Sequence, residues 1–65
     1  MNVGNTMWVD WDGPCQIIVT GNSGGMVNIA RVVNGQASNK VTDQYHGLTH
    51  SELNKMVCNK PKRFN

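Results

Sequence analysis

The chain has 65 residues, a formal net charge of +2 at pH 7 and an apolar fraction of 38%. This length allows one domain, and such a domain buries only about 60% of the surface that its unfolded chain exposes. No segment reaches the ~20 consecutive apolar residues of a membrane-spanning helix, and the N-terminus lacks the basic start and apolar run of a secretory signal. We therefore expect a cytoplasmic protein without a membrane partner, and the start at Met1 favours a complete small gene product.

The apolar composition favours strands over a helical bundle. Eight valines and three isoleucines stand against only two leucines. β-Branched residues suit pleated, half-buried surfaces, whereas the packing seams of helical bundles rely on leucine. A core of this size supplies only a few kcal/mol of net stability. We therefore expect a homodimer, which would bury further surface.

Two strands are predicted in the first third of the chain. Residues 7–11 are rich in strand formers, and the turn residues at 12–14 end this strand. Residues 15–20 are rich in strand formers and predict the second strand. The glycine-rich segment 21–25 is predicted to be a flexible connection. The core face of the second strand should carry Cys15, Ile17 and Val19.

A third strand over residues 26–33 is followed by a strong hairpin signal. Asn34-Gly35 is typical of a type I′ turn, because both central residues of that turn need positive φ angles. Residues 36–44 should return as a polar edge strand that Lys40 protects from pairing with other sheets. Val27, Ile29 and Val33 are expected on one face of the third strand. The expected pairs are Val33 with Gln36, Val32 with Ala37, and Asn28 with Val41.

One helix is predicted near the C-terminus. Thr49 and Glu52 have the spacing of a capping box, in which the two residues satisfy each other's backbone N–H groups. Asn59 suits the position after the helix, and Pro61 prevents continuation. The expected hydrophobic staple consists of Leu48 and Leu53, and the expected sheet-facing stripe of Leu53, Met56 and Val57.

These elements predict the α+β class, with a small antiparallel sheet of three to four strands and one short C-terminal helix packed on it. We expect residues 1–59 to form a single compact domain. Residues 60–65 carry three basic side chains and should form a flexible tail.

The segment Gly21–Gly25 is similar to the Gly-x-Ser-Gly-Gly nucleophile motif of chymotrypsin-like proteases. That family needs a histidine base, an orienting acid and two barrels. Here the chain is too short, and both histidines follow the serine. We therefore predict no enzyme and no catalytic residue. A hairpin loop is the main interpretation, and the alternative is a phosphate or ligand contact through Asn22, Ser23, Gly24 and Gly25.

Cysteines and histidines give no recognised metal motif. Cys15 and Cys58 are the only cysteines, and we expect two free thiols, with a disulfide as the alternative. His46 and His50 are four residues apart, but the Thr49 cap places His46 outside the helix. A zinc site of two cysteines and two histidines lacks finger spacing, so we predict neither a metal nor a cofactor.

Two features suggest binding. Trp8 and Trp11 should point to opposite faces of a strand, and an outward tryptophan is a typical anchor for a protein partner. We therefore predict a small non-enzymatic binding protein, an inhibitor or adaptor of the phage-encoded kind, that acts on a protein partner or sequesters a ligand. The alternative is nucleic-acid binding by the basic C-terminal half. Its contact residues would be Lys60, Lys62, Arg63 and Phe64.

Overall fold

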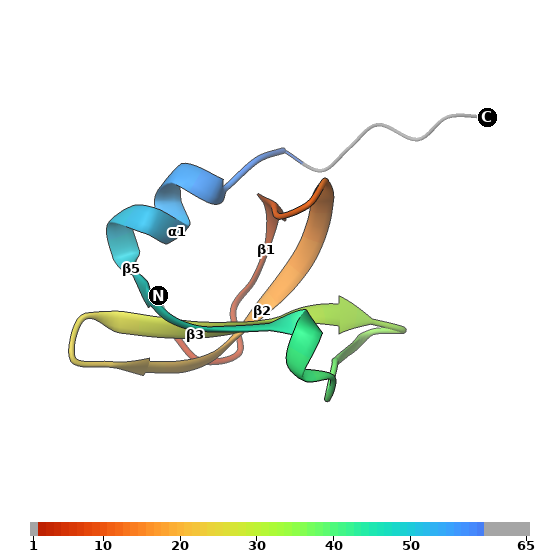
Figure 1. The fold of residues 1–65 in the computed structure, drawn as a ribbon, viewed down its shortest axis with the longest axis horizontal. Coiled ribbons are helices and arrows are strands. Elements are labelled where there is room, and N and C mark those ends of the chain that lie inside the picture. Colours follow the sequence, from red (N-terminus) through yellow and green to blue (C-terminus); the bar gives the residue numbers. More distant parts are fainter. Residues whose placement is uncertain (1, 60–65) are drawn as a thin grey trace.

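The computed structural model describes residues 2–59 as an antiparallel sheet with one short helix packed against it (Figure 1). This confirms the predicted α+β class. No helix in this part of the chain is long and apolar enough to cross a membrane. In chain order the elements are β1 (Thr6–Asp10), β2 (Pro14–Ser23), β3 (Met26–Val33), β4 (Gln36–Ala37), the 3-10 turn η1 (Val41–Asp43), β5 (Gln44–Thr49) and α1 (His50–Met56).

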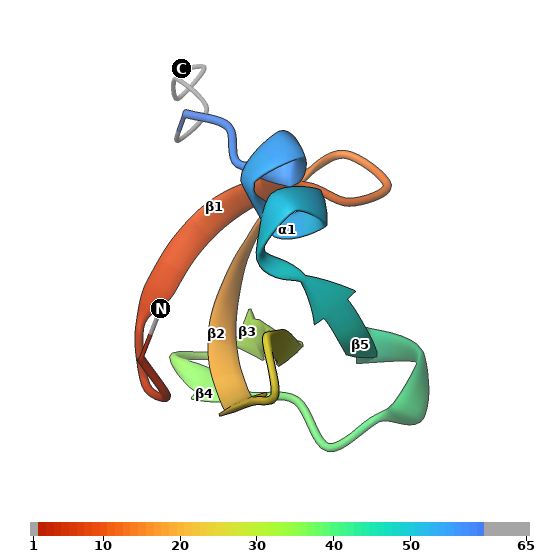
Figure 2. The same ribbon diagram turned by 90° about the vertical axis from the view of Figure 1, so that its left-hand side faces the viewer.

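The sheet is curled so that its two ends approach each other. β1, β2 and β3 form a meander, and β4 and β5 share the far side of β3. Figure 2 shows α1 between β1 and β5, and the chain after α1 returns to the free edge of β1. There Val57 forms a bridge with Val9, and the Cys58 N–H donates to the Trp8 carbonyl at 2.9 Å. This return covers part of the β1 edge.

The core lies on the concave face of the sheet, beneath α1. The buried cluster consists of Val9, Ile17, Val19, Val27, Ile29, Leu48 and Leu53. Burial of these side chains is the main contribution to stability in so small a domain. Four partly exposed side chains pack around the cluster: Met7, Trp11, Cys15 and Met56.

Two tight hairpins set the register. Asn34 and Gly35 both have positive φ angles, 53° and 79°, which confirms the predicted turn. Val33 pairs with Gln36 and Val32 with Ala37, as expected. The predicted connection at 21–25 is a hairpin, as expected, but its turn is shorter than predicted. β2 continues to Ser23, and only Gly24-Gly25 turn, because two glycines adopt positive φ at little cost.

The predicted returning strand over 36–44 is wrong, because β4 stops at Ala37 and the chain turns through η1 into β5. Val41 is 83% exposed and does not pair with Asn28. Asn28 instead faces a bulge in β5, where its Oδ1 accepts the Gly47 N–H at 3.0 Å. This path places Leu48 in the core. β5 forms the outer edge of the sheet beside β3, and its bulge, not Lys40, interrupts that edge.

The helix begins where the sequence predicts. Thr49 Oγ1 accepts the Glu52 N–H at 3.0 Å, and Glu52 Oε1 accepts the Thr49 N–H at 3.1 Å, which confirms the capping box. Its predicted end near Asn59 is wrong, because α1 stops at Met56. Val57 is extended and 47% exposed, so it does not belong to the buried stripe. The bridge to Val9 accounts for this early end.

Candidate functional site

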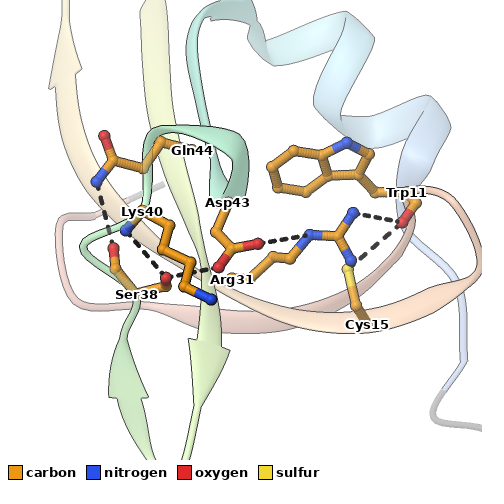
Figure 3. A network of polar contacts seen from close by, with 7 residues as sticks. All are labelled: Trp11, Cys15, Arg31, Ser38, Lys40, Asp43 and Gln44. Atoms are coloured by element: carbon orange, nitrogen blue, oxygen red, sulfur yellow. Dashed lines mark hydrogen bonds and ion pairs between the residues drawn. The ribbon is translucent and has the colours of Figure 1, made fainter.

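The largest polar network of the described chain surrounds Arg31 of β3 (Figure 3). Arg31 lies opposite Ile17, on the face of the sheet that carries the core. A charged side chain beside an apolar core needs compensating partners, because leaving water is costly. The partners come from distant segments of the chain. We call Trp11, Arg31, Asp43 and Tyr45 the Arg31 cluster.

Aromatic rings hold one side of the Arg31 cluster. The Arg31 guanidinium lies 4.3 Å from the centroid of the Trp11 ring, a cation–π contact. Arg31 Nη2 also donates to the Trp11 carbonyl at 3.2 Å. The Tyr45 ring meets the Trp11 ring edge-on, with centroids 6.1 Å apart and planes at 76°. The β1–β2 turn, β3 and β5 are therefore joined at this point.

Asp43 holds the other side. Arg31 Nε lies 3.7 Å from Asp43 Oδ1, which is an ion pair but too long for a hydrogen bond. Ser38 Oγ donates to Asp43 Oδ2 at 2.6 Å, and Gln44 Nε2 donates to the Ser38 carbonyl at 3.2 Å. These contacts fix the connection between β4 and β5, as Figure 3 shows.

The Arg31 cluster remains partly open to solvent. The Arg31 and Asp43 side chains are 26% and 22% exposed, and Tyr45 is 44% exposed. Beside the cluster, the Ser38 hydroxyl has the Asp43 carboxylate as its partner and no histidine partner in residues 2–59. No enclosed pocket is found in this part of the chain.

The two predicted tryptophan anchors are not brought together. Trp8 pairs with Gln16 on β1 and is half-buried. Trp11 follows β1 and is half-buried beneath Arg31. Only Trp11 belongs to the Arg31 cluster.

The other predicted contact residues lie elsewhere. Asn22, Ser23, Gly24 and Gly25 are exposed at the tip of the β2–β3 hairpin, where Asn22 Oδ1 is 3.4 Å from His50 Nε2. This tip is separate from the Arg31 cluster. The predicted nucleic-acid contacts lie outside the described residues; they are Lys60, Lys62, Arg63 and Phe64.

Both cysteines are free and half-buried, as expected. β1 lies between them, because Cys15 pairs with Val9 on one side and Cys58 follows Val57 on the other. Two interstrand spacings, roughly 10 Å, exceed the ~7 Å that a disulfide allows between Cα atoms. Among residues 2–59, no three His, Cys, Asp or Glu side chains are placed to hold a metal ion.

Cys15 gives a prediction for the pH dependence of stability. Burial raises the pKa of its thiol, and nearby Arg31 opposes this only in part. The folded state therefore retains the proton to higher pH than the unfolded chain does. The stability contribution is complete below the unfolded pKa and is lost as the pH rises through the folded one. Urea unfolding at increasing alkaline pH should show this loss, and Cys15→Ala should show a smaller one; equal losses would contradict the assignment.

Sequence reasoning missed Arg31, Asp43 and Tyr45. A signal for Arg31 existed, because it occupies the alternating face that Val27 and Ile29 place in the core. A cation at a core-facing position implies a compensating partner residue, but the sequence does not indicate which residue that is. Comparisons with protein-family models, curated proteins and solved structures found no match for this chain.

Proposed function

We propose that this chain is a small non-enzymatic binding protein, of the inhibitor or adaptor kind, that docks on a protein partner through the Arg31 cluster. One observation carries the proposal. Trp11, Arg31 and Tyr45 are in direct contact and each remains partly exposed. Tryptophan, tyrosine and arginine are the residues most enriched at binding hot spots.

Tyr45 is the residue best placed to contact a partner. Its neighbour across the sheet, Ile29, is fully buried, whereas Tyr45 itself is 44% exposed. Its ring meets Trp11 only edge-on, and its hydroxyl has no hydrogen-bond partner in the described part of the chain. A rigid aromatic side chain with a spare hydroxyl gives contact area at little entropic cost.

The electrostatics of the folded part favour a protein over a nucleic acid. Residues 2–59 contain three cationic and four anionic side chains, and the remaining basic charge lies beyond them. Arg31 also covers one face of the Trp11 ring, so that face cannot stack on a base. Nucleic-acid binding through Lys60, Lys62 and Arg63 therefore stays a prediction from the sequence alone.

A photo-crosslinking amino acid at position 45 tests the proposal in the native host. We expect crosslinks to one other protein, and none when the same group is placed at position 57. Val57 is the matched control, because it is 47% exposed but lies at the β1 edge. With the purified partner, Tyr45→Ala should weaken binding about tenfold or more, and Val57→Ala should leave it unchanged.

Three results would contradict the proposal. Equal crosslinking from both positions would mean that the contact is unspecific. Crosslinking only to a second copy of the chain would replace the protein partner with a homodimer. Equal affinity of Tyr45→Ala and the wild-type protein for the crosslinked partner would remove the Arg31 cluster from the interface.

A further inference from the structure

The hydrogen-bond donors of Arg31 are mostly unused. A guanidinium has five N–H donors, and within residues 2–59 only Nη2 makes a hydrogen bond, to the Trp11 carbonyl. Nε is buried without a hydrogen-bond acceptor. The contact of the guanidinium with the Trp11 ring and the Nη2 bond to the Trp11 carbonyl restrict the orientation of the group, so its remaining donors have a defined direction. The side chain is 26% exposed, so an incoming acceptor can reach it.

Asp43 does not occupy the unused N–H donors of Arg31. Its carboxylate makes a short hydrogen bond with Ser38 at 2.6 Å, whereas its distance to Arg31 is 3.7 Å. Charge-assisted bonds between arginine and a carboxylate are normally near 2.7–2.9 Å and often bidentate. Asp43 therefore balances the charge of Arg31 without taking its directional bonds.

We infer that Arg31 binds a carboxylate group of the protein partner. This inference rests on the proposed function, and it specifies the chemistry of the group that docks. The guanidinium would donate through its terminal nitrogens, while Nε remains beside Asp43. The Tyr45 ring lies edge-on to the same Trp11 ring that the guanidinium contacts, where it can contact the rest of the acidic residue. The negative charge of Asp43 repels the incoming carboxylate and so limits its affinity.

The test uses two capped tripeptides, acetyl-Gly-Glu-Gly-amide and acetyl-Gly-Gln-Gly-amide, which differ only in the carboxylate. Nitrogen-15 NMR follows the Arg31 side-chain Nε–H and the Trp11 indole N–H during titration at millimolar concentration. We expect a saturable shift with the glutamate peptide alone. Asp43→Asn should tighten binding about twofold or more by removing the repelling charge. Lys40→Gln is the matched control, because it removes an exposed cation of the same connection, and it should change nothing.

Equal shifts with both peptides, or no shift with either, would overturn the inference. So would tighter binding that follows Lys40→Gln and not Asp43→Asn. Backbone spectra of each variant must first match the wild-type fold. The outcomes remain separable from the proposed function. If the glutamate peptide has no effect but partner binding still depends on Tyr45, only the inference of a carboxylate ligand is excluded. If the glutamate peptide binds but partner binding does not depend on Tyr45, only the proposed partner interface is excluded.

Discussion

Replacing Leu53 with alanine is expected to unfold most of the protein at 25 °C. Leu53 is fully buried and belongs to the core cluster, which it joins from α1. Truncation of a buried leucine costs about 2–5 kcal/mol. A core of this size supplies only ~3–5 kcal/mol in total, so the loss should remove nearly all of the net stability. Circular dichroism with urea titration measures it.

Asn54→Ala is the control for this experiment. Asn54 is exposed on the same helix, so its substitution should change the free energy of unfolding by no more than about 0.5 kcal/mol. If Leu53→Ala were as mild as Asn54→Ala, α1 would not be packed on the sheet.

Replacing Trp11 with alanine should have the second largest effect. The Trp11 ring packs on the core, makes a cation–π contact with the Arg31 guanidinium and contacts the Tyr45 ring edge-on. We expect a loss of about 3 kcal/mol, at the lower end for tryptophan truncations because Trp11 is only half-buried. Chemical unfolding gives the value.

Trp8→Ala provides a matched comparison. Trp8 is also half-buried, but it makes no aromatic or cation–π contact in the described part of the chain. Its truncation should cost less by about 1 kcal/mol, the combined scale of the two contacts that only Trp11 makes. A larger loss at Trp8 would mean that the Arg31 cluster contributes little to the fold.

Local signals in the sequence predicted the elements whose geometry a few neighbouring residues determine. Asn34-Gly35 selects a two-residue turn, and that turn fixes the pairing of Val33 with Gln36. Thr49 and Glu52 satisfy each other within one helical turn. In both cases the partners lie within three residues of one another along the chain.

The errors arose where a distant segment decides the structure. β5 is polar and interrupted by Gly47, so no periodic pattern identifies it; its pairing with β3 and the burial of Leu48 determine its course. Val57 leaves the helix because Val9 offers a strand partner. The Arg31 cluster joins residues up to 34 positions apart, from Trp11 to Tyr45, and no local rule brings them together.

The arrangement of the edges changes the argument for a homodimer. The sequence predicted one polar edge strand, whereas Val57 covers part of the β1 edge and a bulge interrupts β5. Both features disfavour pairing of strands between two copies. A dimer therefore stays a prediction that rests on the small core alone.

Whether the Arg31 cluster binds a partner is tested most directly by comparing folding and binding for Tyr45→Ala. Tyr45 is 44% exposed and makes one edge-on ring contact, so its loss should cost the fold only about 1 kcal/mol. Urea unfolding and the dissociation constant for the crosslinked partner should be measured on the same sample. We expect this small loss of stability together with at least about tenfold weaker binding. A loss of about 3 kcal/mol in folding with an unchanged dissociation constant would show that the Arg31 cluster serves the fold alone.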